Sequence, residues 1–128
     1  MSNVIKCPCN SNKEYEVCCE EVHKNPKTAS SAEDLMRARY AAFVLQEIEF
    51  IYDTFHPNTR RFQQKRDIAN WALESKWMQL EIVESKTNTV EFKAHYMDTE
   101  GNIHVHHEKS TFRQVQKVWY YVDGKIMS

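Results

Sequence analysis

Cysteine is missing from most of this sequence, because all four cysteines lie within the first nineteen residues and none follows Cys19. A small secreted domain held together by disulfides would need cysteines along its whole length, so this class of protein is disfavoured. No apolar run approaches the roughly 20 residues of a membrane span. The N-terminal residues also lack the charged-then-apolar pattern of an export signal. We therefore expect a cytoplasmic protein with reduced thiols and no membrane contact.

The sequence also lacks an excess of charge of either sign. Its 17 lysines and arginines and 18 acidic residues give a formal net charge of -1, and four thiolates around one divalent ion would make it about -3. We therefore expect no general nucleic-acid binding and disfavour contact with the ribosome. Two basic clusters remain, which we interpret as solvated helix faces rather than phosphate contacts: Arg37 with Arg39, and Arg60, Arg61, Lys65 and Arg66.

What the sequence does contain is a dense cysteine motif, which we call the knuckle: the segment from Cys7 to Cys19, with ligands Cys7, Cys9, Cys18 and Cys19. Four thiolates brought to one point suit a tetrahedral, borderline-soft cation, and zinc is the first choice. Disulfide pairing is a weaker alternative because Cys18 and Cys19 are neighbours, and a redox role lacks the CxxC spacing. A site with four thiolates has no open position. We therefore predict one structural zinc ion that does not activate water.

The residues between the cysteine pairs suit a tight turn. Asn10 and Asn12 tolerate the left-handed backbone conformation that such a turn requires. Ser11 is expected to cap a short helix over residues 13–18. Tyr15 and Val17 are expected to supply the apolar backing of the metal site.

Beyond the knuckle the pattern changes from helical to extended. Residues 23–30 read as a polar connector, and Ser31 followed by two acids indicates a helix N-terminus. Apolar residues at helical spacing predict helices over residues 32–55 and 67–75, the first stopped by His56-Pro57. Strands are predicted over residues 80–84, 89–96, 103–112 and 118–122. This order predicts an α+β fold in which helices pack on one face of a curved antiparallel sheet.

Two resemblances cover nearly the whole chain. The knuckle resembles a SEC-C motif, a zinc module, in Cys7-Pro8-Cys9, Ser11, Lys13, Tyr15 and Cys18-Cys19. The rest is similar to the YchJ family in Met36-Arg37-x-Arg39-Tyr40, Phe55-His56-Pro57, His107-Glu108-x-Ser110-x-Phe112 and Trp119-Tyr120-Tyr121-Val122-Asp123-Gly124. The resemblances imply a SEC-C-type zinc-binding motif over residues 1–24 and an NTF2-like domain over residues 25–128. Such a domain is a cone of helices against a bent sheet, and the resemblance implies no particular activity.

Cones of this type often enclose a pocket, for which we select Tyr40, His107, Glu108 and Trp119 as candidate ligand contacts. Strand alternation places His104, His106 and Glu108 on one face and His107 on the other, so His107 and Glu108 cannot form a side-by-side dyad. An inward His107 could act as a general base. We favour the alternative that these groups form structural hydrogen bonds to Arg37 or Arg39. No catalytic residue is therefore assigned.

The same strand offers a second metal hypothesis. His104 and His106, joined by His95 or an acid across the sheet, could bind a transition metal. Ordinary exposure of histidines on a solvent-facing strand is the favoured interpretation.

The leading hypothesis for function is an adapter that is not an enzyme. In it, the zinc knuckle captures an unidentified protein partner and the cone is a docking or homodimerising body. The alternative is a small-molecule-binding or enzymatic protein that uses the pocket of the cone.

Overall fold

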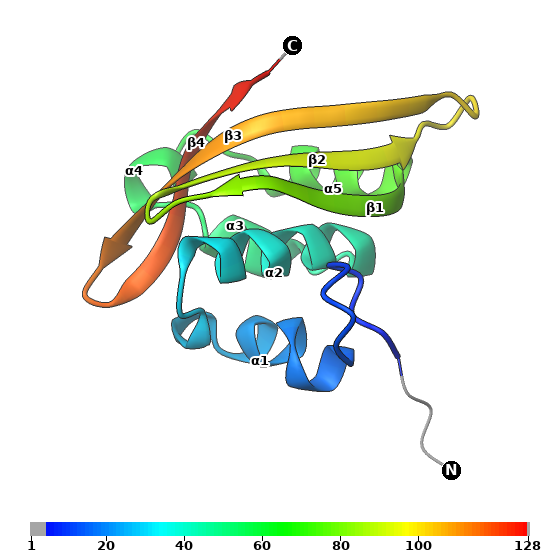
Figure 1. Ribbon diagram of the computed structural model, residues 1–128. Helices are drawn as coiled ribbons and strands as arrows, with labels where there is room; N and C mark the ends of the chain where they lie inside the picture. The colour runs from blue at the N-terminus through cyan, green and yellow to red at the C-terminus, as the bar shows by residue number, and fades with distance from the viewer. Residues whose placement is uncertain (1–4, 128) are drawn as a thin grey trace.

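Three layers stack in the computed structural model, which describes residues 5–127 (Figure 1). The first layer is a four-stranded antiparallel sheet in the order β1-β2-β3-β4, formed by Lys76–Ser85, Thr89–Met97, Ile103–Val115 and Val118–Ile126. The second covers one face of the sheet with α2 (Ala32–Leu45), α3 (Ile48–Asp53) and α5 (Lys65–Glu74). The third layer lies on the far side of α2 and contains the knuckle, η1 (Tyr15–Val17), α1 (Cys19–Lys24) and η2 (Pro26–Thr28). The predicted α+β architecture is confirmed.

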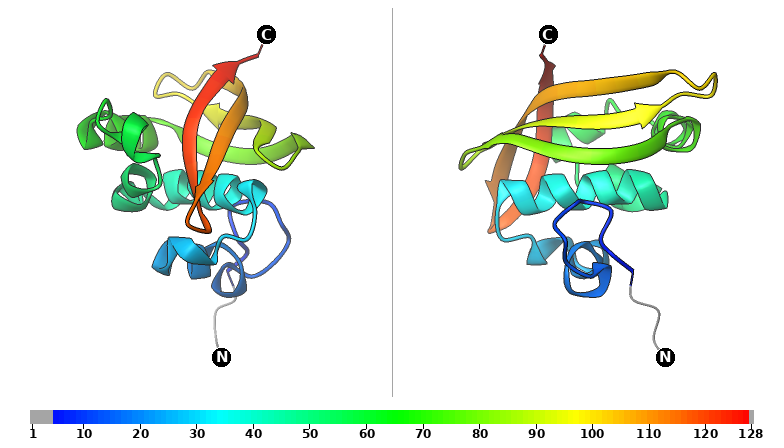
Figure 2. Two further views of the ribbon diagram at one scale, coloured as in Figure 1. Left: turned by 90° about the vertical axis from the view of Figure 1, so that its left-hand side faces the viewer. Right: turned by 45° about the vertical axis from the view of Figure 1, so that its right-hand side comes forward.

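The sheet is strongly bent, so that the β3–β4 hairpin turns away from β1 and β2 (Figure 2). The register of β3 against β4 shifts between Thr111 and Phe112, and β1 has two further irregularities, between Trp77 and Gln79 and between Ile82 and Glu84. An extra residue on one strand of a pair bends that strand and increases its twist. These irregularities curve the sheet around the helices.

Helix α2 lies at the centre of the fold, because it contacts β1, β2 and β4 as well as α1. It begins as predicted, with the Ser31 hydroxyl accepting a hydrogen bond from the backbone N–H of Asp34 at 3.1 Å. The prediction of one helix over residues 32–55 is wrong. Gln46 adopts a left-handed conformation with φ of 59°, which ends α2 and lets the chain turn back into α3. His56 then precedes the short helix α4 (Pro57–Arg60).

The core joins all three layers. Leu35 and Ile51 from the helices and Val90 and Phe112 from the sheet are fully buried. Cys7, Cys9 and Cys19 belong to the same cluster of buried side chains. Within residues 5–127, no helix is both long enough and apolar enough to cross a membrane.

Candidate functional site

The four cysteines converge on one point. Their Sγ atoms all lie within 4.8 Å of one another, with 3.7 Å between Cys9 and Cys18 and 3.9 Å between Cys18 and Cys19. All four are free thiols. A metal ion needs deprotonated thiols at such spacings. The cluster could therefore hold one metal ion.

The turn between the cysteine pairs is formed by the two asparagines, as predicted. Asn10 and Asn12 have φ of 65° and 68°. Ser11 does not cap a helix. Its hydroxyl accepts a hydrogen bond from the N–H of Lys13 at 3.2 Å and lies 3.2 Å from the sulfur of Cys18, whereas η1 begins at Tyr15 after an N-cap, Glu14, that makes no side-chain cap bond.

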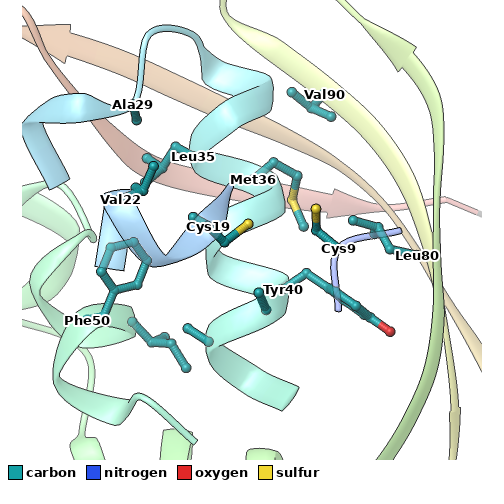
Figure 3. Close-up of a cluster of buried hydrophobic side chains, with 14 of the residues drawn as sticks. Cys9, Cys19, Val22, Ala29, Leu35, Met36, Tyr40, Phe50, Leu80 and Val90 are labelled. Atoms are coloured by element: carbon teal, nitrogen blue, oxygen red, sulfur yellow. The ribbon is translucent and has the colours of Figure 1, made fainter. Parts of the chain in front are cut away.

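The predicted apolar backing of the metal site is only half right. Tyr15 is partly buried and packs against the core cluster, but Val17 is 59% exposed. The backing comes instead from α2 and β1, because Cys9 and Cys19 lie among the buried side chains around Met36 and Leu80 (Figure 3).

Hydrogen bonds fasten the knuckle to the rest of the protein. The Asn10 side chain accepts from the backbone N–H of Leu80 in β1 at 2.7 Å. The Arg37 guanidinium in α2 donates to the carbonyl of Cys9 at 2.8 Å. The knuckle is thus held against both α2 and the sheet, and Arg37 is a structural contact rather than a solvated basic residue.

His23, which the sequence places in a polar connector, is a partly buried link in the same region. Its Nε2–H donates to the carbonyl of Ala38 at 2.7 Å, and its Nδ1 accepts from the hydroxyl of Tyr15 at 2.6 Å. Burial lowers the pKa of His23. The neutral imidazole therefore joins α1 to α2.

A cavity of about 390 Å³ lies between α2, α5 and the concave face of the sheet. Its walls are rich in aromatic side chains, including Tyr40, Phe43, Trp71, Trp77, Phe92 and Tyr121, and its polar groups include Arg39, His106 and Glu108. A mostly apolar hollow with a few convergent polar groups is typical of small-molecule sites.

Glu108 is the hydrogen-bonded centre of this cavity and is only 8% exposed. Its carboxylate accepts from His106 Nε2–H at 2.7 Å, from the Ser110 hydroxyl at 2.5 Å and from the Tyr121 hydroxyl at 2.7 Å. Burial alone would raise the pKa of Glu108, but these hydrogen bonds outweigh it and lower the pKa. Burial and the adjacent carboxylate raise the pKa of Tyr121. The structure thus holds a carboxylate and a neutral phenol.

Gly124 makes room for that carboxylate. A Cβ atom at this position would overlap Oε2 of Glu108 and lie 2.6 Å from the hydroxyl of Tyr121. Such distances are far inside van der Waals contact, so a side chain here would displace Glu108. Sequence reasoning assigned Gly124 no role, and nothing in its neighbours indicates one.

Arg39 is the second charged group of the cavity and is 6% exposed. Its guanidinium carbon lies 4.4 Å from the ring centres of both Phe55 and Tyr121. Its Nη1 donates to the carbonyl of Ile51 at 2.9 Å and to the hydroxyl of Thr54 at 2.6 Å. Burial lowers the pKa of Arg39 to about 10, so it stays charged at neutral pH.

The interpretation of Arg39 as part of a solvated helix face is wrong. A signal for its burial exists in the sequence, because position 39 follows Leu35 by four residues and precedes Ala42 by three. Residues at these spacings share one helix face.

The predicted pocket residues separate into two groups. Tyr40 and Glu108 line the cavity, and burial raises the pKa of Tyr40 to about 12. His107 lies on the opposite face of β3, where its Nε2–H donates to Glu91 at 2.7 Å. Trp119 is buried but is not part of the cavity wall. Alternation along β3 is as predicted, but the inward histidine is His106.

The proposed histidine metal site does not form within residues 5–127, where the only group of potential ligands close enough to share an ion is the cysteine cluster. His104 bonds Asp98 at 2.7 Å and stacks on Tyr96. His95 lies near Glu81, and His106 is bound to Glu108.

Both parts of the chain match known protein families. Residues 31–124 match a family model described as the middle NTF2-like domain of YchJ, and residues 6–21 match a SEC-C motif. A UPF0225 protein of Vibrio cholerae is 35% identical, with 95% of this chain and 83% of the relative covered. A UPF0225 protein of Geobacter sulfurreducens is 39% identical, covering 92% of this chain and 77% of that protein.

Two solved structures are similar over almost the whole chain. A SEC-C motif containing protein from Rhodopseudomonas palustris has a TM-score of 0.88 at 33% identity, with 97% of this chain and 100% of that chain covered. A SEC-C motif containing protein from Psychrobacter arcticus has a TM-score of 0.77 at 29% identity, with 96% and 83% covered.

Proposed function

For this chain, which belongs to the YchJ family of UPF0225 proteins, we propose the function of a small-molecule-binding protein whose fold is held together by one structural zinc ion. The observation that carries the proposal is the cavity of about 390 Å³, in which buried Arg39 and Glu108 face aromatic walls. Burying a charge is costly unless the charge is paired and hydrogen-bonded, and the guanidinium of Arg39 has no carboxylate partner within ion-pair distance among residues 5–127. Aromatic walls around fixed charges supply both affinity and orientation for a small ligand.

Zinc is supported by the geometry of the thiols. Four sulfurs around a tetrahedral ion with bonds of about 2.3 Å are about 3.8 Å apart. The distances of 3.7 Å and 3.9 Å between neighbouring sulfurs fit this value. A four-thiolate zinc site supplies folding energy and no open position for a substrate. We expect one zinc ion per chain by elemental analysis of the protein purified under reducing conditions, and no zinc in the Cys9→Ser variant.

The proposal that the cavity binds a small molecule can be tested by filling the cavity with a larger side chain. Ala94 is buried in β2 and lines the cavity, so Ala94→Phe fills the space with an aromatic ring. Lys93 is the next residue along and belongs to the other face of the strand, which makes Lys93→Phe the matched control. Protein purified from its native host is denatured, and the small molecules that it releases are identified by mass spectrometry.

We expect a compound released by the wild-type protein and by Lys93→Phe but absent from Ala94→Phe. The same compound should raise the unfolding temperature of the wild-type protein when it is added back. A set of released compounds that is identical for the three proteins would contradict the proposal.

An adapter is the second candidate function. Val17 and Ile5 are 59% and 65% exposed on the knuckle side of the molecule, and exposed apolar side chains can anchor a protein partner. Crosslinking in the host lysate should then capture a macromolecule with the wild-type protein and lose it with Val17→Ser. Cytoplasmic localisation, which both candidates assume, is tested by fractionating the same host.

A further inference from the structure

Arg39 has hydrogen-bonding capacity that the protein does not use. Both of its hydrogen bonds within residues 5–127 come from Nη1, which leaves Nε and Nη2 without an acceptor there. In the same residues, no carboxylate lies within the 4.0 Å of an ion pair with this guanidinium. Arg39 is nevertheless buried and lines the cavity.

Glu108 does not supply the missing acceptor for Nε and Nη2 of Arg39. Its two carboxylate oxygens already accept three hydrogen bonds, from His106, Ser110 and Tyr121. Its charge favours the charged guanidinium from beyond ion-pair distance. The two aromatic rings on either side of Arg39 contribute cation–π attraction but no acceptor atom.

A second donor in the cavity wall is also unused. Trp77 lines the cavity, and its buried indole Nε1 has no hydrogen-bond partner among residues 5–127. A buried donor without an acceptor costs about 1–3 kcal/mol. The cavity therefore contains free donors on a buried cation, while its buried acid, Glu108, already accepts three hydrogen bonds. The other acid of the wall, Asp123, is exposed.

The unused edge of Arg39 selects the chemistry of a ligand. Nε and Nη2 form one side of the planar guanidinium, a fork that matches the two oxygens of a carboxylate. The aromatic side chains of Tyr40, Trp71 and Trp77 suit a flat body by stacking or edge contacts.

We propose that the cavity binds a small organic acid with a planar apolar body, whose carboxylate pairs with the Nε and Nη2 edge of Arg39. This inference rests on the proposed function, because it names the class of molecule that the cavity takes. It assigns recognition to Arg39, while Glu108 remains an internal anchor for His106 and Tyr121.

The organic-acid proposal is tested with two matched probes, naphthalene-2-carboxylate and 2-naphthamide, which share size and shape but differ in charge. Their binding to the zinc-loaded protein is measured by titration calorimetry at neutral pH. We expect the carboxylate to bind at least about tenfold more tightly, the ratio that corresponds to about 1.4 kcal/mol. Arg39→Met should abolish this ratio, and Arg39→Lys should restore part of it.

Lys93→Met is the control, because it removes a cation from β2 outside the cavity and should leave the ratio unchanged. Near-ultraviolet circular dichroism shows whether each variant retains its fold. If Arg39→Met does not fold, the ratio in the wild-type protein and in Arg39→Lys still decides the question.

Equal affinity of the two probes for the wild-type protein would overturn the organic-acid inference and leave the cavity as a ligand site. Binding of neither probe would overturn it as well, and the Ala94→Phe comparison of released compounds then decides separately whether the cavity has a ligand at all.

Discussion

The hydroxyl of Tyr121 donates a 2.7 Å hydrogen bond to Oε2 of Glu108, and the guanidinium carbon of Arg39 lies 4.4 Å from the ring centre of the same tyrosine. One side chain of β4 therefore contacts both Arg39 and Glu108, the buried charged groups of the cavity. This arrangement also joins the sheet to the helices, because the backbone N–H of Tyr121 donates to the carbonyl of Thr54 at 2.8 Å.

Tyr121→Phe removes the hydroxyl and keeps the ring. We expect the free energy of unfolding to fall by about 1–3 kcal/mol, because a buried carboxylate loses one of its three donors. The measurement is urea denaturation, with Tyr120→Phe as the control on the neighbouring position. A Tyr121→Phe protein as stable as the control would show that the hydrogen bond contributes nothing.

Gly124→Ala introduces a methyl group where Oε2 of Glu108 now lies. We expect it to lower the unfolding free energy by about 1–3 kcal/mol, as overpacking does. Combining it with Glu108→Ala should make the effect of Gly124→Ala smaller, because the carboxylate, the nearer of the two obstructing groups, is gone and only the Tyr121 hydroxyl remains. Additive effects in this double-mutant cycle would contradict the steric account.

Gly101→Ala is the contrast for this experiment. Gly101 has φ of 86°, but apart from its two chain neighbours no residue within 5–127 has an atom within 4 Å of where a Cβ would lie. Its substitution should cost only backbone strain, and Glu108→Ala should not relieve that cost.

His23 predicts a dependence of stability on pH. Its pKa in the folded protein lies below the usual 6.5, so the unfolded chain binds more protons as the pH falls. The contribution of the neutral imidazole is fully present above about pH 6.5 and is lost progressively below it. We expect the unfolding free energy of the wild-type protein to decline between pH 7.5 and about pH 5.5.

His23→Gln can keep both hydrogen bonds without titrating, because an amide can accept from Tyr15 and donate to Ala38. Its stability should decline less over the same pH range than that of the wild-type protein. Parallel curves for wild type and His23→Gln would refute the assignment.

Metal removal should affect more than the knuckle. Cys7, Cys9 and Cys19 are part of the main buried cluster, and the knuckle bonds both Leu80 and Arg37. We expect chelation under reducing conditions to lower the unfolding temperature by at least about 10 °C, since each kcal/mol lost shifts it by several degrees. Amide exchange should quicken in α2 and β1, and unchanged exchange there would mean that the knuckle and the cone are independent.

The sequence predicts the order of the elements well, because periodicity is a local property. The order of helices followed by four strands, the N-cap at Ser31 and the left-handed Asn10 and Asn12 all appear as predicted. The strands are longer than predicted, since sheet pairing extends past the residues with strong β propensity. The break at Gln46 has no such signal, because its left-handed conformation depends on how α3 packs back onto α2 and α5.

The candidate site was only partly predictable for a related reason. Cysteine spacing predicts a four-thiol cluster from sequence alone, and alternation separates His107 from Glu108. Which face of β3 turns inward depends on the bend of the sheet, so His106 was not selected. The contact between Asn10 and Leu80 joins residues 70 positions apart, and no local pattern indicates it.

The tryptophans provide the most direct test of the central claim that the cavity is a ligand site. Of the chain's three tryptophans, Trp71 and Trp77 line the cavity, and Trp119 is buried outside its wall. Their indole N–H signals can be followed by NMR during titration with naphthalene-2-carboxylate. The account predicts saturable shifts of the Trp71 and Trp77 signals while the Trp119 signal stays in place. Three unmoved signals, or three signals that shift alike, would contradict it.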